Sequence, residues 1–129
     1  MDMSSWNILL VDDEVEFIST LAERLELRGI NARVTHDGES ALREVADEEP
    51  QVMVLDVMMP GLKGLDVLQR VRESHPKVQV ILLTGQGKTR DGIEGMRYGA
   101  FAYLMKPLDL EELIQTLGEA VKAQGANHA

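Results

Sequence analysis

The chain has 129 residues, of which 44% are hydrophobic and 27% charged, a balance that fits a globular domain and argues against disorder. Its net charge of −9 argues against direct nucleic-acid binding, and the absence of cysteine excludes disulfide bonds and thiolate metal sites. No apolar run reaches the roughly 20 residues of a membrane span and the N-terminus lacks signal-peptide features, so we expect a cytoplasmic protein without membrane contacts.

Strand-like and helix-like patterns alternate five times along the chain, beginning with the apolar run 8–11. Apolar residues at helical spacing over 18–25 predict a helix that stops at Gly29. Residues 32–35 predict a second strand, and residues 38–48 predict a second helix.

The second half of the chain repeats the alternation. Residues 51–56 predict a third strand, a helix follows as far as Pro76, and residues 78–83 predict a fourth strand. The helix expected over 89–98 has the weakest pattern because it holds two glycines, and glycine costs about 1 kcal/mol in a helix interior. We therefore expect this helix to be comparatively mobile. Residues 101–105 predict a fifth strand.

A strongly amphipathic last helix is expected from about Asp109, followed by a frayed tail over 124–129. Five strand–helix units with nearly continuous apolar strands predict a parallel sheet with helices on both faces, which is a doubly wound α/β fold. No linker or repeat divides the sequence. We expect a single domain over residues 1–129, with a short N-terminal lead and a core from about 7 to 122.

Polar residues of complementary chemistry follow four of the expected strands: Asp12 and Asp13, Asp56, Thr84, and Lys106. In an open parallel sheet the carboxyl ends of neighbouring strands meet at one crevice, so these side chains should lie together. Clustered carboxylates suit Mg²⁺, which prefers oxygen ligands, and Mn²⁺ is an expected substitute. Asp56 is the candidate nucleophile for a phosphoryl group, which Lys106 would hold by charge and Thr84 by a hydrogen bond.

Other interpretations of these residues fit less well. Aspartates after a strand also serve as simple helix caps, but that reading leaves the other strand-end residues unexplained. Residues 87–89 resemble the end of a phosphate-binding loop, yet that motif needs a glycine where Leu82 stands. A phosphatase of the haloacid dehalogenase type shares the strand-end aspartate but carries a second aspartate two residues later, where this chain has Met58.

Taken together, the strand-end residues resemble the receiver domain of bacterial two-component response regulators, including the chemotaxis regulators. The segment 55–61 is similar to that family's phosphoacceptor loop, and 82–85 and 99–107 are similar to its later signatures. The match covers about 7–122. Gly85 is a mild departure, because the family more often has alanine or serine there, and it would loosen its loop and weaken the switch. The resemblance implies a five-stranded sheet in the flavodoxin-like order 2-1-3-4-5.

The resemblance also implies roles for individual residues. Asp56 would accept phosphate from the phosphohistidine of a sensor histidine kinase or phosphotransfer protein, or from acetyl phosphate. The side chains of Asp13 and Asp56 and the Met58 backbone carbonyl would bind Mg²⁺. Asp12 would mainly contact the groups that bind the ion rather than the ion itself. The Lys106–Pro107 bond is a candidate cis peptide. The chain would catalyse only its own phosphorylation and slow dephosphorylation, so it would not be an enzyme with other substrates.

Phosphorylation would then act as a switch. Thr84 would move toward the phosphoryl group and Tyr103 would turn inward, changing the face formed by the helix at 89–98, the fifth strand and the last helix. Met58 and Gln86 would tune the lifetime of the phosphorylated state. The partners implied on the output side are a downstream protein or an attached effector domain, and a second copy in a phosphorylation-dependent homodimer.

Two alternatives remain open at the level of the sequence. One is a hydrolase that uses Asp56 as a turnover nucleophile on phosphate esters. The other is a docking domain that works without phosphorylation. The number of phosphates released per chain separates the first alternative from the switch.

Overall fold

Five parallel strands form one sheet in the order β2-β1-β3-β4-β5, which confirms the expected order. The structure, a computed structural model, describes residues 2–59, 61–85 and 89–126. The strands are β1 (Ile8–Val11), β2 (Ala32–Thr35), β3 (Val52–Asp56), β4 (Gln79–Thr84) and β5 (Ala102–Met105). The helices are α1 (Val15–Leu27), α2 (Gly38–Asp47), α3 (Gly64–Ser74), α4 (Thr89–Arg97) and α5 (Leu110–Ala126), preceded by a 3₁₀ turn at Met3–Ser5.

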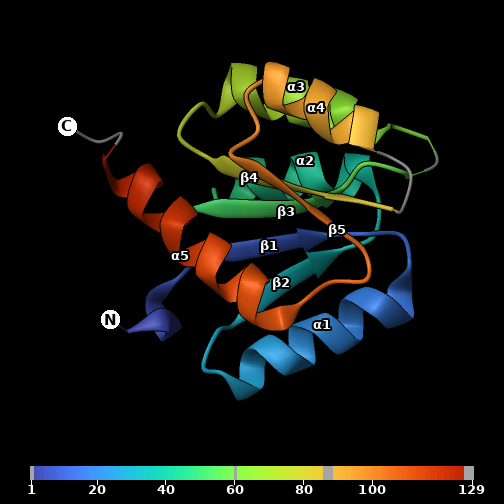
Figure 1. Cartoon of the computed structure of the whole chain (residues 1–129). Helices are drawn as coiled ribbons and strands as arrows, with labels where there is room; N and C mark the ends of the chain where they lie inside the picture. The colour runs from blue at the N-terminus through green and yellow to red at the C-terminus, as the bar shows by residue number, and fades with distance from the viewer. Residues whose placement is uncertain (1, 60, 86–88, 127–129) are drawn as a thin grey trace.

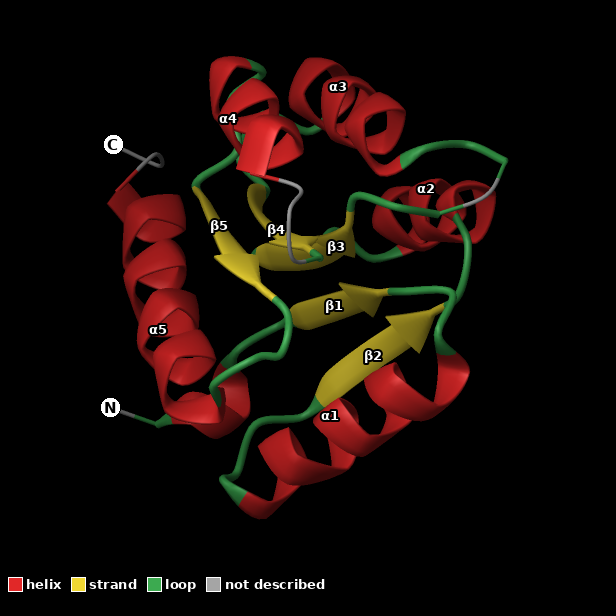
Figure 2. Ribbon diagram, turned by 45° about the vertical axis from the view of Figure 1, so that its right-hand side comes forward, coloured by secondary structure: helices red, strands yellow, loops and turns green. Residues whose placement is uncertain are grey.

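Helices cover both faces of the sheet, as the doubly wound α/β fold requires (Figures 1 and 2). The helices α1 and α5 pack on one face, and α2, α3 and α4 pack on the other. Each strand is followed by a helix along the chain, because parallel strands need a crossover connection. Within the described ranges, no helix combines the length and the apolar character needed to cross a membrane.

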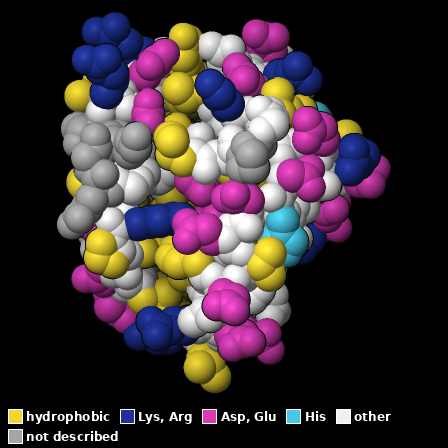
Figure 3. Space-filling view, turned by 90° about the vertical axis from the view of Figure 1, so that its right-hand side faces the viewer, with side chains coloured by type: hydrophobic (Ala, Val, Ile, Leu, Met, Phe, Trp, Pro, Cys, Tyr) yellow, Lys and Arg dark blue, Asp and Glu magenta, His cyan; other side chains and the backbone are white. Residues whose placement is uncertain are grey.

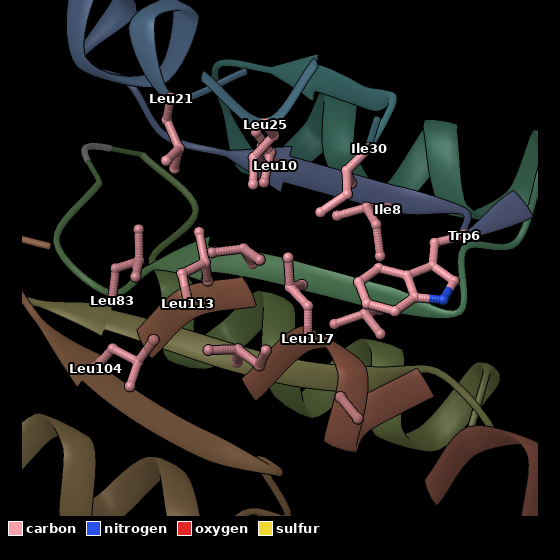
Figure 4. Packing of buried hydrophobic residues seen from close by; sticks show 14 of the residues in the cluster. Trp6, Ile8, Leu10, Leu21, Leu25, Ile30, Leu83, Leu104, Leu113 and Leu117 are labelled. Atoms are coloured by element: carbon pink, nitrogen blue, oxygen red, sulfur yellow. The ribbon is translucent and has the colours of Figure 1, made fainter. Parts of the chain in front are cut away.

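The strands contribute to two separate cores, one on each face. Leu10 belongs to the core beneath α1 and α5, whereas its neighbour Leu9 belongs to the core on the opposite face. This division follows from the strand geometry, which points successive side chains to opposite faces. In Figure 4, Leu113 and Leu117 of α5 extend into the first of these cores, and Trp6 lies at its end.

The strand register brings the expected site residues to one edge of the sheet. Val11 of β1 pairs with Thr35 on β2 and with Leu55 on β3, and Thr84 of β4 pairs with Met105 on β5. The residue that follows this register position is an aspartate on β1, an aspartate on β3 and a lysine on β5. Three charged side chains therefore emerge at the carboxyl edge of the sheet.

The last helix extends into the segment that was expected to form a frayed tail. It continues to Ala126, so residues 124–126 are helical in the structure. Gln124, in the last turn, is only 8% exposed. The remainder of the expected tail, residues 127–129, lies outside the described residues.

The two glycines of α4 form its contact with the sheet. Both Gly92 and Gly95 are buried. A Cβ atom on Gly95 would lie 2.0 Å from Cδ1 of Leu82 on β4, and one on Gly92 would lie 2.6 Å from the ring of Tyr103 on β5. Only glycine leaves room for this close approach. The two residues that lower the helix propensity of α4 are therefore also the ones that let it pack against the sheet.

Candidate functional site

Three carboxylates meet at the carboxyl edge of the sheet. Asp12 and Asp13 follow β1, and Asp56 is the last residue of the neighbouring β3. One oxygen from each carboxylate lies within 4.8 Å of the others. Asp12 is fully buried and Asp56 is 4% exposed, whereas Asp13 is exposed. Because clustered carboxylates repel one another without a cation, this all-oxygen donor set fits a divalent metal ion.

Lys106 supplies a positive charge to this cluster. Its Nζ lies 2.9 Å from Asp12 Oδ2, 2.6 Å from Glu14 Oε1 and 3.7 Å from Asp56 Oδ2. Burial lowers the pKa of Lys106, but the hydrogen bonds to Glu14 and Asp12 together with the charges of Asp56 and Asp12 outweigh burial and leave its pKa above the ordinary value. The side chain is therefore a permanent cation at neutral pH.

Asp56 is ionised at neutral pH in spite of its burial. Burial raises the pKa of Asp56 to about 6, and the negative charge of Asp12 adds to this rise. The Met58 N–H and the Lys106 ammonium act in the opposite direction. The Met58 N–H donates a hydrogen bond of 3.0 Å to Asp56 Oδ1. A partly dehydrated carboxylate with one cation nearby is suited to act as a nucleophile.

Thr84 brings a hydroxyl without a hydrogen-bond partner to the same edge of the sheet. The residue is fully buried, and its Oγ1 has no hydrogen-bond partner among the described residues. Its backbone carbonyl accepts a hydrogen bond of 2.8 Å from the Lys106 N–H, which ties the ends of β4 and β5 together. Leaving a buried hydroxyl unpaired costs about 1–3 kcal/mol. An added group with free acceptor oxygens, such as a phosphoryl group, would satisfy it.

The remaining predicted residues lie around this cluster. Met58 is 51% exposed in the loop after β3. Tyr103 is half-buried, with its ring against Gly92 of α4. The Lys106–Pro107 peptide bond is cis. Gln86 lies outside the described residues, and the metal contact of the Met58 carbonyl and the movement of the two switch side chains stay predictions.

A groove of about 730 Å³ adjoins the site between α1 and the loop that follows β5. Phe17 and Leu21 of α1 line it together with Leu108, and Lys106 lies in its wall. Figure 3 shows the face at the carboxyl edge: acidic side chains gather near its centre beside a basic side chain, and hydrophobic side chains lie recessed next to them. The charged cluster therefore opens onto a partly apolar surface.

The sequence pattern did not reveal two contacts of Lys106, those with Glu14 and Phe17. The Phe17 ring centroid lies 4.4 Å from the Lys106 Nζ. Glu14 is 92 residues away from Lys106 along the chain. An acidic residue at a helix start also stabilises the helix dipole, so its residue type alone does not point to a lysine partner. The three-residue spacing of Glu14 and Phe17, which puts both on one side of the first helical turn, was the one available signal.

Comparison with known proteins agrees with this geometry. The family model for the response regulator receiver domain matches residues 8–118. The transcriptional regulatory protein CpxR of Escherichia coli (strain K12) is 45% identical over 107 residues, which make up 83% of this chain and 45% of CpxR. The chain spans about half the length of the curated relatives it matches.

Solved structures give the same result. The receiver domain of NtrX from Brucella abortus has a TM-score of 0.85 at 32% identity, covering 89% of this chain and 98% of that one. A response regulator receiver domain protein from Clostridium thermocellum has a TM-score of 0.89 at 29% identity, covering 94% of this chain and 98% of that one.

Proposed function

The chain belongs to the response regulator receiver domain family, and from this membership and the site geometry we propose that it is a phosphorylation-controlled signalling switch. One observation carries the proposal. The buried Asp56 carboxylate is clustered with two further carboxylates and lies 3.7 Å from the Lys106 ammonium. A buried anion with acidic neighbours and a cation is suited to accept a phosphoryl group in the presence of a divalent metal ion.

In the proposed reaction, an oxygen of Asp56 attacks the phosphorus of a phosphohistidine or of acetyl phosphate. A bond forms between that oxygen and phosphorus, and the bond from phosphorus to the imidazole nitrogen or the acetate oxygen breaks, its electron pair leaving with the departing group. Asp13, Asp56 and the Met58 carbonyl would hold Mg²⁺, with Asp12 contacting these groups rather than the ion, and the bound ion would offset the negative charge of the phosphoryl oxygens. Water later attacks the phosphorus, which restores the carboxylate and releases inorganic phosphate.

In this proposal, Lys106 and Thr84 respond to the phosphoryl group. Lys106 pairs with one phosphoryl oxygen, and the Thr84 hydroxyl, which has no partner among the described residues, donates a hydrogen bond to another. Both residues lie at the linked ends of β4 and β5. Because Tyr103 of β5 lies against Gly92, a shift there reaches α4, which is the two-state element of the proposal.

The output face of the proposed switch consists of α4, β5 and α5. Ile93 and Met96 of α4 and Met105 of β5 are 51%, 43% and 41% exposed. Large apolar side chains exposed on these neighbouring elements favour a contact with another protein. That partner is a downstream protein, an effector domain attached in a longer regulator, or a second copy of the chain in the phosphorylated state.

The phosphodonor in this proposal is a sensor histidine kinase or a phosphotransfer protein in the cytoplasm. Asp56 is almost fully buried, so a protein donor has to bring its phosphohistidine over the open edge of the site. The groove beside Lys106 is continuous with that edge and offers apolar contacts to such a donor. Acetyl phosphate is small enough to enter without these contacts.

Phosphate release separates the switch from a hydrolase. We expect the chain to take up no more than one phosphoryl group from acetyl phosphate and to release none from a simple phosphate ester. The measurement is inorganic phosphate released per chain over time, with Asp56→Asn as the control. Sustained release from the ester by the wild type alone would establish a hydrolase, and no uptake from either donor would favour a docking domain.

Met58→Asn should shorten the lifetime of phosphorylated Asp56 by roughly threefold or more. The exposed Met58 side chain stands beside the acceptor and hinders water, whereas an amide would orient a water molecule toward phosphorus. The measurement is the decay of the phosphorylated mass after removal of the donor. Met96→Asn, a similarly exposed methionine on α4, is the matched control and should decay at the wild-type rate. Equal decay in all three proteins would contradict the role of Met58.

A further inference from the structure

Glu14 directs its carboxylate to the site rather than to its own helix. The residue stands at the N-cap position of α1, where a side-chain oxygen normally accepts a hydrogen bond from the first helical N–H groups. Glu14 makes no such bond. Its Oε1 instead lies 2.6 Å from the Lys106 Nζ, closer than either of the other two carboxylates that contact this ammonium.

Two close contacts of the Lys106 ammonium come from α1 and its N-cap residue. Phe17, one turn after Glu14, places its ring centroid 4.4 Å from Nζ, within the range of a cation–π contact. Asp12 accepts a hydrogen bond from the ammonium at 2.9 Å, whereas Asp56 lies at 3.7 Å, too far for one. Glu14 and Phe17 therefore draw the ammonium toward the helix and away from the acceptor.

We propose that Glu14 is a positioning residue that holds Lys106 in this resting place and competes with the phosphoryl group for it. The inference rests on the proposed function, because it requires Asp56 to be the phosphoacceptor. The Glu14 side chain is 61% exposed, so water solvates it once Lys106 leaves. Releasing the ammonium still breaks the ion pair with Glu14, and the free energy lost with this pair opposes phosphorylation. Glu14 thereby limits how readily the site is phosphorylated.

Two substitutions of Glu14 test the proposal against a general charge effect. Glu14→Gln removes the charge, and Glu14→Asp keeps the charge but shortens the side chain by one methylene group. Glu16→Gln, an exposed acid in the first turn of α1, is the control for losing a negative charge near an anionic donor. The measurement is the second-order rate constant for phosphorylation by acetyl phosphate in saturating Mg²⁺, followed by intact mass.

We expect both Glu14 variants to be phosphorylated about three- to tenfold faster than the wild type, and Glu16→Gln to stay within about twofold of it. In a Lys106→Ala background, followed over longer incubation, Glu14→Gln should change nothing, because the coupling acts through the ammonium. Unchanged rates in both Glu14 variants would overturn the proposal, as would a gain shared by Glu16→Gln or a gain that persists without Lys106. Failure of the proposed function is distinct: the wild type would take up no phosphate, or Asp56→Asn would still take it up.

Discussion

Asp56→Asn is expected to stabilise the metal-free protein at neutral pH by about 1–3 kcal/mol. Burial raises the pKa of Asp56 from 3.8 to about 6, so the folded protein binds this proton more tightly than the unfolded chain does. The carboxyl therefore favours the folded state most below pH 3.8, its penalty grows as the pH rises to 6, and the full penalty holds above that. Asparagine has nearly the same shape, can accept the Met58 N–H and carries no charge to bury.

Urea unfolding of the wild type and the variant in a chelating buffer measures this difference. The gap in the free energy of unfolding should be widest at neutral pH and shrink toward about pH 4, because the wild-type carboxyl then takes up its proton. Asp47→Asn, an exposed acid at the end of α2, should show no such pH-dependent gap. Mg²⁺ should stabilise the wild type more than Asp56→Asn. A variant less stable than the wild type at neutral pH would contradict the free-energy penalty assigned to the buried Asp56 carboxylate.

Gly95→Ala should destabilise the protein by about 1–2 kcal/mol, although alanine is the better helix former by about 1 kcal/mol. The new Cβ atom would lie 2.0 Å from Cδ1 of Leu82, whose side chain is fully buried on β4. Because Leu82 is packed in the core, either its side chain must take a less favourable conformation or α4 must move away from the sheet. The overpacking cost then exceeds the gain in helix propensity.

Gly118→Ala is the matched control for this prediction. Gly118 lies inside α5, where a Cβ atom would meet Trp6 at 3.5 Å, an ordinary van der Waals distance. This substitution should stabilise the protein by up to about 1 kcal/mol. Urea unfolding of both variants tests the difference in sign. A stabilised Gly95→Ala protein would show that α4 does not depend on close contact with β4.

The fold was largely predictable because its strands are short apolar runs separated by helical patterns. The strand order came from the family resemblance, since pairing between distant strands leaves no local trace in one sequence. Helix propensity alone marks Gly95 as a residue that weakens the helix, whereas the structure shows that it lets α4 pack closely against Leu82. The end of α5 was missed because the burial of Gln124 depends on the tertiary fold.

The candidate site was predictable where it follows from topology alone. Asp12, Asp56 and Lys106 each lie at the carboxyl end of a strand of a parallel sheet, so their convergence needs no knowledge of side-chain directions. The pairing of Lys106 with Glu14 was not predictable, because it depends on how two side chains 92 residues apart are directed across the crevice. The raised pKa of Asp56 likewise follows from burial, which only the folded chain defines.

The most direct test is to incubate the wild type and Asp56→Asn with Mg²⁺ and acetyl phosphate and to measure their intact masses. We expect the wild type to gain one phosphoryl group of about 80 Da, and to gain none after chelation of the metal ion or after substitution of Asp56. A gain that survives in Asp56→Asn would contradict the assignment of the acceptor. A wild type that neither gains mass nor responds to beryllofluoride in Trp6 fluorescence would contradict the phosphorylation switch itself.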